Sequence, residues 1–360
     1  MKRIWLVALA IVMILTCFAG CGGKDDTETT DPNANNTTTE STTKKAVSGN
    51  INLLTGLSGL SDEAVGKRPM AIMINNIKSS LPQYGISSAD ILYEIVTEGG
   101  ITRMMAIYGD YTKIPNVCSV RSCRYYFPIF AQGYDAVYFC FGANETLGYP
   151  TLKRIGIDYF DGKTYGTKLF DRDQERRKTY ALEHTGYVKG PNIPSVLKSE
   201  KVRTDLLDEM NKTAFNFISD DTAKAPGKES CIKVNVQFSN QYYSTFKYDK
   251  EKDVYYKSHS GNAHKDSATG KQLSFTNLFI LQTDIHNYKN QSIMEVDWRG
   301  GDGYYVSHGA VCEIKWEKKS EASSIVYYDK ETGEELKVNP GKSYIAVAKK
   351  GQTTLKGETA

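Results

Sequence analysis

The sequence Ile91-Leu-Tyr-Glu-Ile-Val-Thr-Glu-Gly-Gly-Ile-Thr-Arg-Met-Met-Ala-Ile-Tyr108 contains two apolar runs that are joined by a pair of glycines. Runs rich in Ile, Val and Tyr favour strands, and two adjacent glycines favour a tight hairpin turn. With the glycines as the two turn residues, alternation along each strand places Glu94 and Glu98 on one face of the sheet with Arg103. This cluster is either a structural ion-pair ladder or a polar site that orients a ligand.

Neighbouring segments extend the hairpin into a mixed α/β sheet. Short apolar runs at 70–74 and 136–141 predict two further buried strands. Ser122 is a candidate N-cap for a helix that ends at Gln132, and Pro128 within it predicts a kink or a later start. Strands and helices that alternate in this way build sheets whose strand ends carry polar loops.

The expected helix start carries the main site hypothesis. Helix N-termini present free N–H groups and a partial positive charge, and Arg121 and Arg124 flank this one, which predicts an anion-binding arrangement. The alternative is that these guanidiniums only pair with Glu94 and Glu98. Later loops add Arg172 and His184 to this group. The candidate ligand-binding residues are Arg103, Arg121, Ser122, Arg124, Arg172, His184, Glu94 and Glu98.

After residue 230 the pattern changes to short alternating strands separated by turn signals. The fold class we expect is α+β, an N-terminal mixed α/β sheet domain followed by a smaller, mostly antiparallel β domain. The expected strands of the second domain are 232–238, 243–248, 254–257, 277–283, 303–307, 310–316, 325–328 and 344–348. The expected organisation is a signal peptide at 1–20, a disordered tether at 21–50, an α/β domain at 51–212, a linker at 213–229, a β domain at 230–352 and a tail at 353–360.

The N-terminus has the pattern of an export signal. Lys2 and Arg3 precede an apolar run from Ile4 to Leu15, and Ala19-Gly20 lead into Cys21. We expect Cys21 to be lipidated as in bacterial lipoproteins, so that the chain is anchored on the extracytoplasmic face of the bacterial cell membrane. The alternative is an uncleaved anchor helix. Residues 22–43 are polar and rich in Thr, which predicts a disordered spacer.

Composition limits the remaining choices. The formal net charge of +3 argues against a dedicated nucleic-acid surface, and 24 tyrosines against 13 phenylalanines favour sheets whose faces meet solvent or ligand. The cysteines beyond Cys21 are scattered and odd in number. They are interpreted as buried thiols, with a bridge such as Cys118–Cys140, metal binding or nucleophilic chemistry as alternatives. The cysteines concerned are Cys118, Cys123, Cys140, Cys231 and Cys312.

Four segments occur in order along the chain: Arg68-Pro-Met-Ala-Ile-Met-Ile-Asn75, Ala89-Asp-Ile-Leu-Tyr-Glu94, Glu98-Gly-Gly-Ile-Thr-Arg103 and Ser119-Val-Arg-Ser-Cys-Arg124. Together they resemble the YerB-like lipoprotein family of Gram-positive bacteria, whose N-terminal part is the domain of unknown function DUF3048. The second half is similar to the C-terminal β domain of that family at Asp266, Gly270, Asn277, Trp316-Glu-Lys318 and Asn339-Pro-Gly341. The resemblance implies an architecture and a location, because the family has no established activity.

The chain departs from the family pattern at two of the candidate positions. Cys140 stands where the family commonly has a histidine, and Glu183-His184-Thr185 stands where the family has Pro-His-Asn. A mechanism that needed the strand histidine would therefore have to use Cys140, or it would not operate in this chain.

Three functions are compatible with these patterns. The first is an envelope lipoprotein that binds an anionic or carboxylate-bearing ligand, such as peptidoglycan stem peptides or teichoic acid. The second is an envelope hydrolase or transferase, with Glu94, Glu98, Cys140 and His184 as candidate catalytic residues. The third is a protein-interaction module. No cofactor is expected, and the His259-Ser-Gly-Asn-Ala-His264-Lys-Asp266 loop is interpreted as a solvated connection rather than a metal site.

Overall fold

The structure is a computed structural model that describes residues 49–219 and 224–357, which belong to one compact unit. These residues are mostly β structure in several sheets. The expected signal peptide, Cys21 and nearly all of the expected tether lie outside the described residues. Among the residues described, no helix has the length and apolar character needed to cross a membrane.

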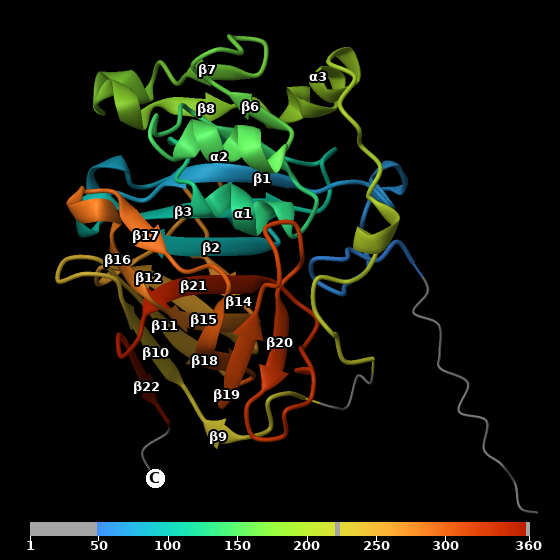
Figure 1. Cartoon of the computed structure of the whole chain (residues 1–360), viewed down its shortest axis with the longest axis vertical. Coiled ribbons are helices and arrows are strands. Elements are labelled where there is room, and N and C mark those ends of the chain that lie inside the picture. The colour runs from blue at the N-terminus through green and yellow to red at the C-terminus, as the bar shows by residue number, and fades with distance from the viewer. Residues whose placement is uncertain (1–48, 220–223, 358–360) are drawn as a thin grey trace, which may run out of the picture. The chain divides into compact units, whose positions relative to one another are not determined.

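The main sheet runs through both halves of the chain (Figure 1). Its order is β20-β19-β18-β15-β21-β2-β3-β1-β5-β6, and β9 pairs with β19. The strands of the first half are β1 (Met70–Asn75), β2 (Ile91–Val96), β3 (Thr102–Tyr108), β5 (Val137–Cys140) and β6 (Tyr159–Asp161). The strands of the second half are β9 (Glu229–Ser230), β15 (Asn277–Thr283), β18 (Gly300–Ser307), β19 (Ala310–Glu317), β20 (Val326–Asp329) and β21 (Ser343–Lys349).

The central strands are buried on both faces, as their continuous apolar sequences predict. Every residue of β1, β2 and β3 is buried. β3 pairs antiparallel with both β1 and β2, whereas β5 runs parallel to β1. The mixed sheet expected from the first half is therefore confirmed.

A second sheet and two small sheets complete the β structure. Phe246 of the second sheet packs against Tyr344 of the main sheet, with 4.6 Å between the ring centroids. The second sheet consists of β10 (Lys233–Gln237), β11 (Tyr243–Asp249), β12 (Val254–His259), β13 (Asn262–Ala263), β14 (Ser274–Phe275) and β22 (Thr353–Lys356). The small sheets are β16 (Ile285–Asn287) with β17 (Met294–Val296), and β4 (Val117–Cys118) with β7 (Phe170–Arg172) and β8 (Gly186–Val188).

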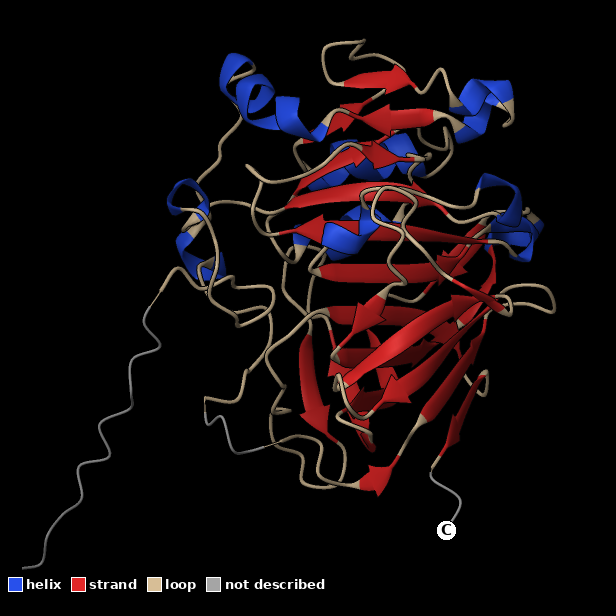
Figure 2. Ribbon diagram, turned by 180° about the vertical axis from the view of Figure 1, so that it is seen from behind, coloured by secondary structure: helices blue, strands red, loops and turns tan. Residues whose placement is uncertain are grey.

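The helices are short and lie around the sheets (Figure 2). The α-helices of the described residues are α1 (Tyr126–Gln132), α2 (Gly148–Ile155) and α3 (Ile193–Ser199). The 3₁₀ turns are η1 (Asp62–Ala64), η2 (Lys78–Ser80), η3 (Ile86–Ser88), η4 (Glu98–Gly100), η5 (Arg176–Lys178), η6 (Leu182–His184), η7 (Gly190–Asn192), η8 (Asp208–Met210) and η9 (Tyr288–Asn290).

Helix α1 starts later than Ser122, so the prediction of a cap at Ser122 is wrong. The helix begins at Tyr126, which places Pro128 in the first turn, where its missing N–H has no intrahelical partner to lose. Ser122 instead donates its Oγ hydrogen to the Phe141 carbonyl oxygen at 3.1 Å. Arg121 and Arg124 therefore flank an irregular segment, not a helix start.

The hairpin exists, but its predicted register is wrong by one residue. The predicted two-residue turn at Gly99-Gly100 would pair Val96 with Arg103, whereas the structure pairs Ile95 with Arg103 and Val96 with Thr102. The turn is longer than two residues because Thr97 N–H donates to the Ile101 carbonyl oxygen (2.7 Å) around the η4 turn.

This change of register moves Glu94 and Arg103 to opposite faces of the main sheet, since side chains alternate along a strand. Tyr93 shares a face of β2 with Ile95, the partner of Arg103, and stacks on Phe130 of α1 with 5.4 Å between ring centroids. Glu94 contacts Ser244 of the second sheet. Arg103 therefore lies on the face of the main sheet that α1 covers, which we call the helix face. Glu94 lies on the opposite face, between the main sheet and the second sheet.

The expected boundary at 213–229 does not divide the main sheet. Strand β21, near the end of the chain, pairs in parallel with β2 on one side and with β15 on the other. The expected linker is partly packed, because Phe215 stacks on Phe279 with 4.9 Å between centroids. The expected tail also contributes a strand, since β22 pairs with β10.

Candidate functional site

The segment after β4 brings Arg121 to the helix face of the main sheet. Its N–H donates to the Met73 carbonyl oxygen (3.1 Å) in β1, and its carbonyl oxygen accepts from Phe141 N–H (3.0 Å) just after β5. Two backbone bonds thus hold Arg121 between β1 and the residue that follows β5.

Glu98 of the hairpin loop is shared by two arginines. Arg124 donates through Nε to Glu98 Oε2 at 2.7 Å, and its Nη2 also bonds this carboxylate. Arg103 Nη2 lies 3.6 Å from Glu98 Oε1, while its Nη1 donates to the Ser122 carbonyl oxygen at 2.6 Å. The pairing predicted with Glu98 is therefore present, and the pairing predicted with Glu94 is not.

Arg121 differs from its neighbours because its guanidinium makes no hydrogen bond or ion pair within residues 49–219 and 224–357. It is half-buried, and burial lowers its pKa while Glu183 raises it. Arg121 in turn lowers the pKa of Arg103, after the larger effect of burial, which brings that pKa to about 10. All of these guanidiniums remain protonated at neutral pH.

Arg172 and His184 complete the group on this side. Arg172 donates to the Leu182 carbonyl oxygen at 2.6 Å and stacks over the Phe141 ring at 4.1 Å. His184 is buried, its Nδ1 lies 2.9 Å from the Asn75 amide nitrogen and its Nε2 lies 3.3 Å from Ser79 Oγ. Burial, and then Arg121, lower the pKa of His184, which favours the neutral imidazole.

We call Arg103, Arg121, Arg124 and Arg172 the arginine cluster. Glu98 and Glu183 are the carboxylates that interact with it, so the cluster carries more positive than negative charge. Arg103 Nε is buried and has no partner among the described atoms. The cluster can accept an anion at Arg121 without first breaking an internal ion pair.

Glu94 belongs to a different polar group, in which Lys257 is its ionic partner. Both side chains are fully buried, and Lys257 Nζ lies 3.1 Å from Glu94 Oε2. Thr102 Oγ1 and the Asn76 amide donate to Oε1, at 2.8 and 2.9 Å. Ser244 and Tyr344 hydroxyls donate to Oε2, both at 2.8 Å. Burial alone would raise the pKa of Glu94, but Lys257, then His259 and the Ser244 and Thr102 hydroxyls, lower it.

The hydrogen bonds continue from Lys257 through His264 to the first half of the chain. Lys257 Nζ lies 3.1 Å from His264 Nδ1, and His264 Nε2 lies 2.9 Å from Gln83 Oε1. Gln83 donates to the Asn75 carbonyl oxygen at 2.7 Å. Sequence reasoning missed Lys257 because it lies far from Glu94 in the chain, and it missed Gln83 because its partner His264 is equally distant. The sequence signal for Lys257 was its position between Tyr255 and His259 on one face of β12.

All five described cysteines are buried and free, which confirms the interpretation as buried thiols and excludes the Cys118–Cys140 bridge. Burial raises the pKa of Cys118 to about 12 and that of Cys140 well above its ordinary value. A thiol of high pKa is a poor nucleophile at neutral pH, because the thiolate is the reactive form.

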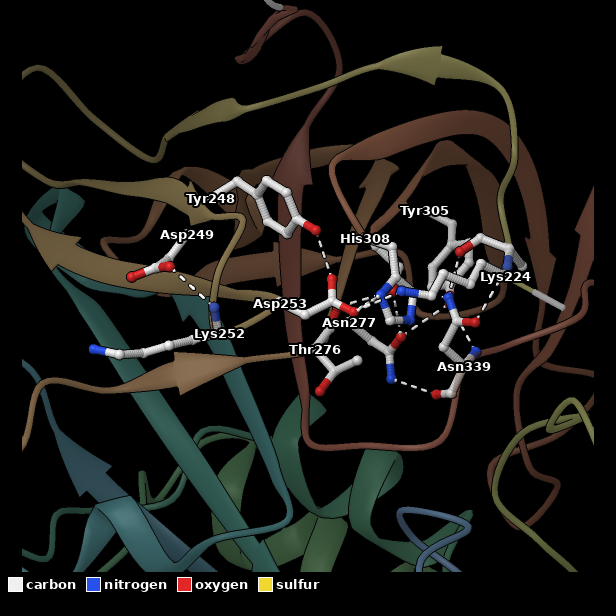
Figure 3. A network of polar contacts seen from close by, with 12 residues as sticks. Lys224, Tyr248, Asp249, Lys252, Asp253, Thr276, Asn277, Tyr305, His308 and Asn339 are labelled. Carbon is white, nitrogen blue, oxygen red and sulfur yellow. Dashed lines mark hydrogen bonds and ion pairs between the residues drawn. The ribbon is translucent and has the colours of Figure 1, made fainter. Parts of the chain in front are cut away.

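Two asparagines from the predicted family motifs hold the second half together (Figure 3). Asn277 Oδ1 accepts from the Tyr305 hydroxyl at 2.9 Å, and its amide donates to the Asn339 carbonyl oxygen at 2.8 Å. Asn339 Oδ1 accepts from Ala225 N–H at 3.1 Å, which ties the expected linker to this network. These asparagines satisfy buried backbone groups and so have a structural role.

The interpretation of the His259–Asp266 segment as a solvated connection is wrong for His259, His264 and Asp266, which are all buried. The segment does not gather metal ligands. His264 uses both ring nitrogens as described above, and Asp266 accepts from Ser87 N–H at 2.8 Å. Across the residues that the structure covers, there is no group of three or more His, Cys, Asp or Glu side chains placed to hold a metal ion.

The fold and these motifs define the class of the protein. Residues 54–203 match the N-terminal domain, and residues 234–345 the C-terminal domain, of the protein family of unknown function DUF3048, and the chain belongs to this family. It is similar to YerB of Bacillus subtilis (strain 168), named as a candidate lipoprotein, with 27% identity over 354 residues that cover 96% of each chain. The crystal structure of YerB from Bacillus subtilis matches with a TM-score of 0.72 and 26% identity, covering 85% of this chain and 99% of that one.

Proposed function

We propose that this protein is an envelope lipoprotein that binds an anionic or carboxylate-bearing ligand through the arginine cluster. The observation that carries the proposal is Arg121, a half-buried guanidinium without a hydrogen-bond or ion-pair partner among the described residues. A guanidinium fork matches a carboxylate or phosphate in two parallel bonds, so a ligand would supply what the fold does not.

The location is part of the same proposal. Cys21 follows a short apolar run and small residues, and the related YerB is named as a candidate lipoprotein. Lipidation of Cys21 would hold the chain at the membrane, on its extracytoplasmic face, and the polar residues that follow would act as the spacer.

The ligands expected there are peptidoglycan stem peptides, through their carboxylates, and teichoic acids, through their phosphates. Both are anionic, and the excess of guanidinium over carboxylate in the arginine cluster favours either one. The carboxylate or phosphate of the ligand is therefore the group that we expect the arginine cluster to recognise, whichever polymer presents it.

The test is calorimetric titration of the full chain in detergent, with a stem-peptide mimic that has a free D-alanine carboxylate and with glycerol phosphate. Arg121→Ala should weaken binding of the preferred probe by about tenfold or more, because one charge-assisted pair is lost. Arg121→Lys should weaken it less, since the charge stays and only the fork is lost.

The melting temperature should stay unchanged in Arg121→Ala, because that side chain makes no bond that stabilises the fold. Arg299→Ala, which removes an exposed arginine paired with Asp297, is the matched control and should leave binding unchanged. Equal binding by Arg121→Ala and the parent chain, or no binding of either probe, would contradict the proposal.

A further inference from the structure

A cavity of about 400 Å³ lies between the η2 segment and the loop that joins β12 to β13. Lys78 and Lys265 line it together with His259, and Leu81, Pro82 and Ala263 supply apolar walls. A volume of this size is within the range of small-molecule sites. The cavity does not include any residue of the arginine cluster.

His259 is the unusual group in this cavity. Its side chain is 2% exposed, and neither ring nitrogen has a hydrogen-bond partner among the described residues. Its ring packs 5.7 Å from the Tyr242 ring and 5.6 Å from the His264 ring, measured between centroids. A buried polar group without a partner costs free energy that a bound ligand can recover.

The charge at the cavity is positive. No acidic side chain is among its lining residues, and neither Lys78 nor Lys265 forms an ion pair within the described residues. Lys78 Nζ lies 5.2 Å from the centroid of the Tyr242 ring, which leaves its N–H donors free for a ligand. Two buried carboxylates lie on segments next to the lining residues, and both have partners: Glu94 is paired with Lys257, and Asp266 accepts from Ser87 N–H and Ala268 N–H.

These surroundings keep His259 neutral. Burial, followed by Lys257 and Lys78, lowers its pKa to about 4, although Glu94 acts in the opposite direction. A neutral imidazole offers one N–H donor and one acceptor. Because the lysines repel cations, an acceptor with negative charge fits this site better than an ammonium group.

We propose that this cavity binds a small carboxylate that carries a short apolar group. One carboxylate oxygen accepts from a His259 ring N–H, Lys78 and Lys265 balance the charge, and the apolar group lies against Leu81, Pro82 and Ala263. The site is separate from the arginine cluster and does not depend on the function proposed above.

The test uses butyrate as the probe and butyramide as its uncharged counterpart. The full chain, labelled with ¹⁵N at histidine, is titrated by NMR up to about 50 mM of each compound, a range that detects millimolar affinity. Butyrate should shift the His259 ring resonances and leave those of the exposed His286 unchanged. Butyramide should bind at least about tenfold more weakly.

Variants of His259 and Lys78 distinguish the contribution of the His259 hydrogen bond to butyrate binding from that of the lysine charge. His259→Leu should weaken butyrate binding about tenfold, measured calorimetrically, whereas His259→Gln, which keeps an N–H donor, should weaken it less. Lys78→Ala should weaken it several-fold. Lys250→Ala, at an exposed lysine outside the cavity, is the matched control for net charge and should have no effect.

Four results would overturn the proposal. The first three are no response to butyrate, equal binding of butyramide, and equal binding of butyrate by Lys78→Ala and the parent chain. The last of these holds even where His259→Leu fails to fold. Loss of butyrate binding in Arg121→Ala alone would assign the carboxylate to the arginine cluster and would also refute the cavity site.

Discussion

Glu94 and Lys257 form an ion pair in which both side chains are fully buried. The carboxylate accepts four hydrogen bonds besides the ion pair, from Thr102, Asn76, Ser244 and Tyr344, so that both oxygens are satisfied. A buried pair with complete hydrogen bonding tolerates desolvation, but either charge left alone does not. The pair also joins β2 of the main sheet to β12 of the second sheet.

Glu94→Gln should lower the free energy of unfolding by about 3 to 5 kcal/mol, because it leaves Lys257 buried without its counter-charge. Chemical denaturation at pH 7 measures this loss. The matched control is Glu313→Gln, which removes an exposed partner of Lys330 and should cost less than about 0.5 kcal/mol.

The pH dependence of the stability lost in Glu94→Gln gives a second test of the buried pair. The folded-state pKa of Glu94 lies below its ordinary value, so its contribution is present above the unfolded-state pKa and is lost as pH falls through the folded-state pKa. The stability difference between the parent chain and Glu94→Gln should therefore shrink in acid. A difference that grows as pH falls would show that the carboxylate is not stabilised in its charged form.

At the scale of elements, the turn between β2 and β3 decides which side chains meet. Gly99 and Gly100 both have left-handed backbone angles, with φ of 69° and 71°. A two-residue turn would place both Glu94 and Glu98 beside Arg103, whereas the longer turn observed leaves only Glu98 there. The glycines therefore position Glu98 against the arginines.

Gly99→Ala should destabilise the protein by about 1 kcal/mol, because a Cβ is strained at positive φ although the space around it is open. Gly99→Asn should cost less, since asparagine tolerates this region better. Gly100→Ala should cost more than Gly99→Ala, because its Cβ would lie 2.9 Å from the Ser239 side chain. Thermal denaturation ranks the three variants, and equal losses for both alanine variants would contradict this account.

At the scale of the described unit, β21 is the strand that joins the two halves of the chain. It is fully buried from Ser343 to Ala348 and lies between β2 and β15. Tyr344 of β21 also packs against Phe246 and bonds Glu94. The two family domains therefore share one core, although their sequence matches are separated by thirty residues.

A chain that ends after Lys342 should fail to fold cooperatively, because the exposed edges of β2 and β15 lose their shared partner. A chain that ends after Lys350 keeps β21 and loses only the edge strand β22, so it should fold with a lower melting temperature. Calorimetry of the parent chain should show a single transition. Two separate transitions, or a stable first half without β21, would contradict a shared core.

Much of the fold was predictable from local pattern. The runs that became β1, β2, β3 and β15 were located within one or two residues, because period and composition are local properties. The export signal is likewise a local pattern, although it lies outside the described residues.

The features that only the tertiary structure decided all depend on contacts between residues that are distant in the chain. These features are the true turn of the hairpin, the pairing of Glu94 with Lys257, the place of β21 beside β2, and the empty hydrogen-bond sites of His259. Local pattern places a charged residue on a strand. Which face it occupies depends on register, and which partner it meets depends on how the sheets pack.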